Sequence, residues 1–568
     1  MKAKIDVATC ALALPAVVLL VFFFYPLLQI GLLSLRAPEF SSAEYRAIFE
    51  NAMYLNVAWR TLSTCALVTL FCLVLGYPTA AFIASLSPAK AKLVLLCVAI
   101  PYLTSFLVRS YGWVVILGDE GLVNHMLQYF GFADDGLAIL YTRTSMMIGI
   151  VHVMLPMMIL PIYASMLRMD TSLLRAAKAL GGGPVRTFFA AYFPQTANGV
   201  LSGCMLVFIV TSGFYITPAM LGGLSDVLLS NLVAVQVTSL LNFSTGAALA
   251  VLLLTGTLLL PLGGFLVRIL VRKGRDSNGS RGAPRRHGWS TVFATVSGFF
   301  FSRLRSKASS AGALRRIPLR AVAALVCIFL VLPSAVVIVA SFTSSASLDF
   351  PPQDYSLRWY RALVNDAQWR SAASISFQVA LAAMAISTSL GLLAAYGVSK
   401  ISSEGRKKAA YAVLIAPLVV PSVVFAIAMF GVLAQWGLIG TREGLIVAHT
   451  VGCIPYVFVV VYGALLMMDP RLEMAAQSLG ATRARTIFRV VLPTIGPALV
   501  SGAVLAFIHS FDEVVITSFV AGVSVETLPL KMWVDIQNKV DPTIAAVSTL
   551  LILIPVAYLV CSRGKLAK

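Results

Sequence analysis

Four ionisable residues stand within stretches of sequence that are otherwise almost entirely apolar. Asp512 and Glu513 are adjacent in one such stretch, His509 precedes them by about one helical turn, and Arg109 lies in another stretch. Residues three or four apart share one face of a helix, so His509 falls on the face of either acid. Ionisable groups inside a membrane are costly and are by default functional or paired. Two carboxylates in such a place could bind a cationic solute such as an amine.

Aromatic residues could complete a path for such a cation, because an aromatic ring attracts a positive charge over its face. The candidate path residues are therefore Arg109, Tyr111, Trp113, Phe214, Tyr215, His509, Asp512 and Glu513. An alternative interpretation is that Asp512 or Glu513 pairs with Arg109 and merely locks two helices together, and the two interpretations can coexist. Two further histidines, His152 and His449, stand alone on apolar stretches and are predicted to be ordinary interior residues.

The elements that position these residues must be membrane spans. The chain is 59% apolar and 12% charged, which is outside the range of soluble globular proteins. A span needs roughly 20 mainly apolar residues. Twelve stretches satisfy this, about 9–34, 59–86, 93–117, 144–168, 198–222, 245–271, 318–341, 374–398, 410–437, 444–467, 497–522 and 543–562. The prediction is an all-α polytopic protein whose two termini lie on the same side of the membrane.

The basic residues indicate the orientation of the chain. The net charge is +20, but Lys and Arg gather in loops that fall on one face of the threaded chain, while the opposite loops carry most of the acids. This pattern is typical of cytoplasmic loops and not of a nucleic-acid groove, so both termini are predicted to be cytoplasmic. A stretch at 272–316, rich in Arg, Ser and Gly, separates two units at 1–271 and 317–568 and is predicted to be a cytoplasmic linker.

Metal and disulfide chemistry are not indicated by the cysteines. The eight cysteines are scattered singly through apolar stretches, without a C-x-x-C pair and without histidines at ligand spacing. We therefore expect no metal site and no disulfide framework.

One polar stretch occurs twice, at 170–181 and at 469–480, with DTSLLRAAKALG in the first copy and DPRLEMAAQSLG in the second. Asp170 and Asp469 can cap a short helix, because a carboxylate accepts the unpaired amides at a helix start. Gly181 and Gly480 can end it. Since each unit has an even number of predicted spans, the two copies should lie the same way up, as two parallel repeats of six helices.

The duplicated stretch resembles the EAA loop of binding-protein-dependent ABC importer permeases. The shared pattern is A-A-x-x-L-G followed by a proline, Pro194 in one copy and Pro493 in the other. The resemblance implies the type I ABC importer permease fold and a coupling helix that docks into a separate ATPase. The residues implied in ATPase coupling are Asp170, Leu173, Arg175, Ala176, Ala177, Gly181, Asp469, Leu472, Glu473, Ala475, Ala476 and Gly480.

Partners follow from the same resemblance. It implies two ATPase subunits on the cytoplasmic side, an extracytoplasmic solute-binding protein, and a location in the bacterial inner membrane. The chain has no Walker A pattern, so we expect no catalytic residues and no bound cofactor, with ATP and Mg held by the partner ATPases. The glutamate that names the loop is replaced by Arg175 and Met474, with Glu473 displaced by one residue.

Flanking stretches narrow the resemblance to spermidine/putrescine importers. TSFLVRSYGW at 104–113, TPAMLGG at 217–223 and NLVAVQ at 231–236 are similar to the first permease of such importers, and SFDEVVITSFVAG at 510–522 and LPLKMW at 528–533 are similar to the second. This implies two fused permeases that carry a polyamine. Other solutes of related fused permeases, namely ferric iron, thiamine or aminophosphonates, stay open, as does an ion-coupled secondary transporter with six plus six spans.

Overall fold

Long apolar helices make up the structure, a computed structural model that describes residues 7–36, 38–132, 136–276, 316–346, 350–538 and 541–563. The predicted all-α class is confirmed, since these residues contain no strand and their one pair of bridging residues is Thr343 and Tyr355. Most of the predicted linker, including the apolar stretch 289–301, lies outside the described residues.

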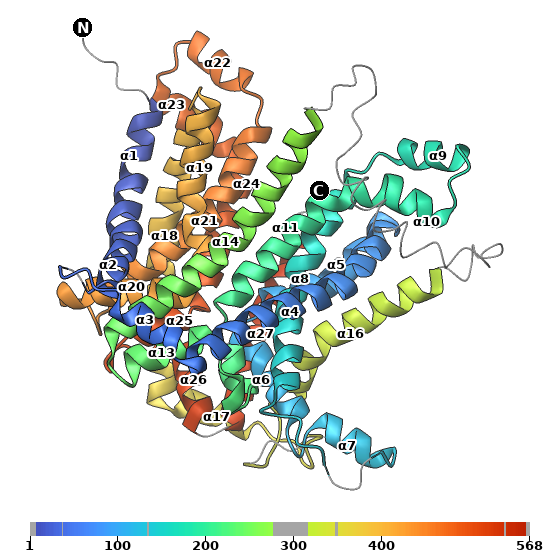
Figure 1. Cartoon of the computed structure of the whole chain (residues 1–568), viewed down its shortest axis with the longest axis vertical. Coiled ribbons are helices and arrows are strands. Elements are labelled where there is room, and N and C mark those ends of the chain that lie inside the picture. Colours follow the sequence, from blue (N-terminus) through green and yellow to red (C-terminus); the bar gives the residue numbers. More distant parts are fainter. Residues whose placement is uncertain are drawn as a thin grey trace.

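The first unit runs from Val7 to Asp276 (Figure 1). Its elements are α1 (Val7–Leu19), η1 (Leu20–Phe24), α2 (Tyr25–Ser34), α3 (Ala43–Glu50), α4 (Ala52–Ala84), α5 (Pro88–Leu103), α6 (Phe106–Leu117), α7 (Leu122–Tyr129), α8 (Arg143–Leu167), α9 (Thr171–Ala179), α10 (Pro184–Thr187), η2 (Phe188–Tyr192), α11 (Phe193–Ser212), α12 (Ile216–Leu221), η3 (Leu224–Asp226), α13 (Leu229–Thr238) and α14 (Phe243–Asp276).

The second unit begins at Arg316. Its elements are α16 (Arg316–Ala340), α17 (Arg358–Asn365), α18 (Ala367–Ser399), α19 (Glu404–Val419), α20 (Ser422–Gln435), α21 (Arg442–Met467), α22 (Arg471–Ser478), α23 (Arg483–Thr486), η4 (Ile487–Val491), α24 (Leu492–Phe511), α25 (Val515–Val520), α26 (Leu528–Asn538) and α27 (Pro542–Arg563).

Eight helices in the described residues are long and apolar enough to cross a membrane, or up to ten if each of two bent pairs is one span. The predicted number of twelve is therefore not confirmed. Each predicted stretch does contain a helix, but α14 and α27 carry shorter described apolar segments, Phe243–Leu259 and Pro542–Ile554.

Two predicted spans, 93–117 and 410–437, are each broken into two helices. The chain bends by 98° between α5 and the helix that begins at Phe106, and by 94° between α19 and α20. In the second case Val420 precedes Pro421 and adopts the extended backbone that a residue before proline prefers. In the first case Ser105 caps the new helix by accepting a hydrogen bond from the Leu107 amide.

Two other predicted spans, 198–222 and 497–522, end earlier than expected. α11 ends at Ser212 and α24 ends at Phe511, and each is followed by a turn and a short helix. Asp512 and Glu513 therefore lie at the end of a helix and not within it, whereas His509 stays on its last turn. At the end of a helix, side chains and unpaired backbone groups can contact a neighbouring element, which the paired backbone of a continuous helix cannot do.

The internal repeat extends over nearly the whole unit. In the described residues every α-helix from α3 to α14, except α7, has a counterpart in the same order in the second unit. Individual contacts repeat as well. The Leu229 amide donates a hydrogen bond of 2.8 Å to the Thr61 hydroxyl, and at the equivalent place the Leu528 amide donates one of 2.7 Å to the Ser376 hydroxyl. The two units therefore have one architecture, and α7 is particular to the first.

A three-helix group forms the centre of each unit, with α8 packed on α4 and α11, and α21 packed on α18 and α24. In the second group a Cβ atom at Gly391 would lie 2.7 Å from the Cβ of Val457, and one at Gly502 would lie 3.3 Å from its Cα. The first group has the same arrangement, with Gly76 against Met158. Small residues at these crossings let membrane helices approach closely.

Gly391→Ala is expected to destabilise the second unit by about 1–3 kcal/mol, because overpacking a tight contact displaces its neighbours. The measurement is the midpoint of thermal unfolding of the purified chain. Gly463→Ala is the matched control on α21, since a Cβ atom there meets nothing within 4 Å. Equal midpoints for the two variants would contradict the close packing.

Candidate functional site

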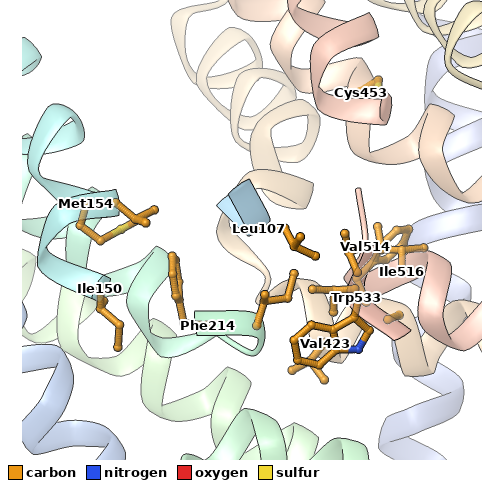
Figure 2. Packing of buried hydrophobic residues seen from close by; sticks show 14 of the residues in the cluster. Leu107, Ile150, Met154, Phe214, Val423, Cys453, Val514, Ile516 and Trp533 are labelled. Carbon is orange, nitrogen blue, oxygen red and sulfur yellow. The ribbon is translucent and has the colours of Figure 1, made fainter. Parts of the chain in front are cut away.

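The two helix breaks line one cavity of about 360 Å³, here called the central cavity. Residues 102–104 and Phe106 contribute from the first unit, and residues 417–422 contribute from the second. The ends of α11 and α24 complete the wall. Figure 2 shows Leu107, Phe214, Val423 and Val514, from both units, within the apolar packing around this region. The central cavity therefore lies at the interface between the two repeats.

Six of the eight predicted path residues line the central cavity, namely Arg109, Phe214, Tyr215, His509, Asp512 and Glu513. The other two lie elsewhere. The Tyr111 hydroxyl donates to the carbonyl of Asp541 at 3.5 Å, and the Trp113 ring packs 5.3 Å from the ring of Phe329 on α16.

Asp512 connects the two units through its carboxylate. One oxygen, Oδ2, accepts a hydrogen bond of 3.1 Å from the Phe106 amide at the start of α6. This geometry is favourable, because a helix start presents unpaired amides and the positive end of its dipole. The other oxygen, Oδ1, is buried and has no hydrogen-bond partner among the described residues. Half of the carboxylate thus caps a helix of the opposite unit, and half is unsatisfied.

The equivalent contact, made by the end of α11 of the first unit with the second unit, involves no charged side chain. Gly213 occupies the position in the first unit that Asp512 occupies in the second, and it lies against the break between α19 and α20. A Cβ atom at Gly213 would be 2.9 Å from the Cβ of Pro421. Each unit therefore places the end of its α11 or α24 against the broken helix of the other unit, and only one of the two contacts carries a carboxylate.

Glu513 and Arg109 have local partners as well. Glu513 Oε1 accepts a hydrogen bond of 2.9 Å from the Ile516 amide and so caps α25. The Arg109 side chain is buried, donates to the carbonyl of Val153 at 3.4 Å and lies 4.8 Å from the Phe106 ring. Among the described residues Arg109 forms no ion pair within 4 Å. Arg109 and Asp512 therefore form no direct salt bridge here, but they still attract one another electrostatically at longer range.

The histidines differ in their surroundings. The His509 ring lies 4.5 Å from the ring of Tyr456, at the wall of the central cavity. His449 is buried, with its ring nitrogens 2.9 Å from the Ser510 hydroxyl and 3.0 Å from the Thr517 hydroxyl. No group of three or more residues that could hold a metal ion occurs in the part of the chain that the structure describes.

The duplicated polar stretches form α9 and α22, two short helices with matching ends. Asp170 accepts from the Ser172 amide at 2.8 Å, and Asp469 accepts from the Arg471 amide at 2.9 Å. The hydrogen bonds from Ser172 hold the pKa of the Asp170 carboxyl below its ordinary value. Both helices end in a glycine with positive φ, +75° at Gly181 and +81° at Gly480.

Both short helices expose the same apolar stripe, spaced Leu-x-x-Ala-x-x-x-Leu. Its last leucine is 85% exposed in the first copy and 89% exposed in the second. Positions three and seven residues apart lie on one helix face. The stripe, here called the coupling stripe, consists of Leu173, Ala176 and Leu180 on one helix and of Leu472, Ala475 and Leu479 on the other.

The two helices are anchored differently. Glu473 is buried and forms an ion pair of 2.6 Å with Lys400 at the end of α18. In the first copy Gln195 bonds to the backbone of Asp170, accepting from its amide at 2.9 Å. Glu473 therefore positions α22 on its own chain, whereas Arg175 and Met474 at the altered position of the loop are exposed.

Sequence reasoning missed Ser105, Tyr456, Pro421 and Lys400. Ser105 and Pro421 stand at the breaks, and the signal for them was the proline content, since Pro101 and Pro417 lie inside the two predicted spans. Proline inside a helix removes a backbone hydrogen bond and favours a kink or an end. No local signal points to Tyr456 or Lys400, because their partners lie on other helices.

Comparison with known proteins gives one family and two kinds of relative. Residues 387–561 match the family described as binding-protein-dependent transport system inner membrane component. The chain is 34% identical over 201 residues to the spermidine/putrescine transport system permease protein PotB of Escherichia coli. This alignment covers 35% of this chain and 73% of PotB. It is 33% identical over 209 residues to the spermidine/putrescine transport system permease protein PotC of Haemophilus influenzae. That alignment covers 37% of this chain and 81% of PotC.

These shares make the chain about twice as long as either relative. Among solved structures, a bacterial ABC transporter that imports the acidic polysaccharide alginate is similar with a TM-score of 0.38 and 15% identity, covering 46% of this chain and 98% of that chain.

Proposed function

This chain belongs to the family of permeases of binding-protein-dependent transport systems, with two permease units in one chain, and we propose that it forms the path of an ATP-driven polyamine importer. It is a multi-pass inner-membrane protein and a permease of an ABC importer. It is not itself an enzyme, since ATP hydrolysis lies with partner ATPases. The choice of a polyamine as cargo, the residues that bind it and the coupling surface are parts of the proposal.

The observation that carries the choice of cargo is the unsatisfied carboxylate oxygen in the central cavity. Asp512 Oδ1 is buried without a partner among the described residues, and an unpaired buried acceptor of this kind costs free energy. An ammonium group of a polyamine would supply the missing donors and the opposite charge. Glu513 stands next to Asp512, and the Phe214 and Tyr215 rings offer cation–π contacts to the same cation. The names of the PotB and PotC relatives agree with such a cargo.

The coupling stripes support the placement of two ATPases. Figure 1 draws α9 and α22 at the upper end of the molecule and α7 and α17 at the lower end. An exposed apolar stripe repeated on both units fits a partner that is itself present twice, because equivalent surfaces bind equivalent partners. This end is then cytoplasmic, together with both termini, and the solute-binding protein docks at the opposite end. The chain binds no cofactor in this proposal, and ATP with Mg belongs to the partner ATPases.

The mechanism follows from how the units meet. When the ATPases close on ATP they move α9 and α22, and with them the two three-helix groups, as nearly rigid bodies. The units touch at the helix breaks, where the Asp512–Phe106 hydrogen bond and the Gly213–Pro421 contact close the central cavity. Movement of the units separates these contacts, so the cavity opens alternately to either side.

Reconstitution tests the proposal directly. The full chain is placed in proteoliposomes with the ATPase and the solute-binding protein of the same transport system, and ATP-dependent uptake of radiolabelled spermidine is measured. We expect uptake that requires all three components and ATP. Thiamine, ferric iron and an aminophosphonate are offered in parallel, and uptake of one of these without spermidine uptake would reject the polyamine but keep the importer. Uptake driven by a proton or sodium gradient without ATP would reject the importer itself.

A further inference from the structure

A second cavity, of about 470 Å³, lies beside the central cavity, between α18, α24, α26 and α27. It is called the side cavity here. Three residues, Leu103, Ile508 and Asp512, line both cavities. The side cavity therefore ends at the place where the two units meet.

The side cavity exists because the two units differ in their last helix. In the first unit α14 packs on α11, and the hydroxyls of Ser212 and Thr257 are hydrogen-bonded at 2.8 Å. In the second unit the position of Ser212 is taken by Phe511, whose bulk lines the side cavity. In the second unit α27 packs mainly on α16 and α17, and its residue Leu551 lines the side cavity. The side cavity is thus a built-in asymmetry of the repeat.

The walls of the side cavity are suited to hydrocarbon. Apart from Ser105, Arg370 and Asp512, every lining side chain is apolar or aromatic. Several apolar lining residues are also exposed, among them Phe377 at 53%, Leu550 at 43% and Ile554 at 61%. These three belong to α18, which is long and apolar enough to cross a membrane, and to the shorter apolar segment Pro542–Ile554 of α27, so we expect the side cavity to open toward lipid.

Arg370 provides a charge at one end of the side cavity. It lies in the first turn of α18 and is exposed, and no carboxylate within 4 Å pairs with it in the described part of the chain. Phe377 lies seven residues further along the helix, about 10 Å deeper at 1.5 Å per residue. The side cavity therefore runs from a cation near the membrane surface toward the apolar interior, which matches the layout of a phospholipid.

We propose that the side cavity binds one phospholipid, with an acyl chain between α24 and α27 and the phosphate at Arg370. The acyl chain fills the gap that α14 closes in the first unit. Its end lies against Ser105 and Ile508, beside the Asp512 contact between the units, so the lipid supports the interface on which alternating access depends. This site does not depend on which solute the permease carries.

Native mass spectrometry of the purified full chain tests the site, with phosphatidylglycerol added at increasing concentration. We expect one phospholipid that stays bound after mild delipidation. Ala373→Trp, which fills the side cavity, is expected to abolish this retention, and Arg370→Ala is expected to weaken it about tenfold, since hydrogen bonds to a charged phosphate are lost. Leu381→Trp is the control, about two turns further along α18 than Ala373 and outside the side cavity. Arg143→Ala controls for the loss of a charge at a helix start.

The outcomes separate the possible occupants. Equal retention by wild type, Ala373→Trp and Arg370→Ala overturns the proposal, and so does a side cavity that retains spermidine instead of phospholipid. If Ala373→Trp does not fold, the comparison of Arg370→Ala with Arg143→Ala decides alone, because both variants remove an exposed charge at a helix start, and Arg143→Ala loses one exposed hydrogen bond to Ser63 besides. Retention lost equally in Arg370→Ala and Arg143→Ala would mean unspecific binding of anionic lipid and would also overturn it.

Discussion

Polyamine uptake is expected to fall about a hundredfold when Asp512 and Glu513 are replaced together by asparagine and glutamine. The loss of a desolvated carboxylate partner for an ammonium group costs about 2–5 kcal/mol, and 2.8 kcal/mol corresponds to about a hundredfold. The amide oxygen of Asp512→Asn can still accept the hydrogen bond from the Phe106 amide, so the contact between the units should be kept. Uptake of spermidine into proteoliposomes is the measurement.

The matched control is Asp366→Asn, which removes a negative charge at the start of α18, outside the central cavity, and keeps an oxygen that can cap the Gln368 amide. We expect it to transport as wild type does. Co-purification with the ATPases should be normal for all these variants. If the double variant forms an intact complex and takes up spermidine as wild type does, the proposal that Asp512 and Glu513 bind the polyamine is rejected. The family assignment is not affected by that result.

ATPase association is expected to be lost when the last leucine of each coupling stripe is replaced, in Leu180→Asp with Leu479→Asp. Both side chains are almost fully exposed in the isolated chain, so a new charge there does not disturb packing within the chain. Buried in an interface, the same charge would be desolvated without a partner and would oppose binding. The measurement is the yield of co-purified ATPase and the ATP hydrolysis of the complex.

The control for this pair is Lys178→Asp with Gln477→Asp, two equivalent positions that are exposed on another face of the same helices. We expect this variant to keep most of the bound ATPase. Each leucine changed alone should give a partial loss, because the other coupling helix still docks. Full association of the double leucine variant would refute the coupling stripes as the docking surface.

Local sequence signals were sufficient for the class of fold, the repeat and the two short helices of the duplicated stretch, α9 and α22. Apolar stretches of the length of a span make a membrane helix nearly unavoidable, since every backbone group in lipid must be paired internally. Asp170 and Gly181 cap their helix through bonds to residues in the same turn or the next. Such features depend on neighbours in the chain, and the sequence alone therefore determined them.

The site required the tertiary structure. Asp512 and Phe106 are far apart in the chain, and their hydrogen bond forms because the end of α24 meets the break between α5 and α6 of the other unit. The ion pair of Glu473 with Lys400 likewise joins residues that are distant in the chain, and no local pattern predicted it. The side cavity depends on how far α27 stands from α24, a distance that no local pattern encodes.

The physical reason for this division is the range of the interactions. Span length, helix caps and glycine stops are set by backbone hydrogen bonds over a few residues, and sequence patterns record them. Which carboxylate oxygen is satisfied and which gap stays open is decided when helices from both repeats pack. Small differences between the repeats, such as Gly213 against Asp512 and Ser212 against Phe511, then give the second unit a carboxylate in the central cavity and a bulky side chain in the wall of the side cavity.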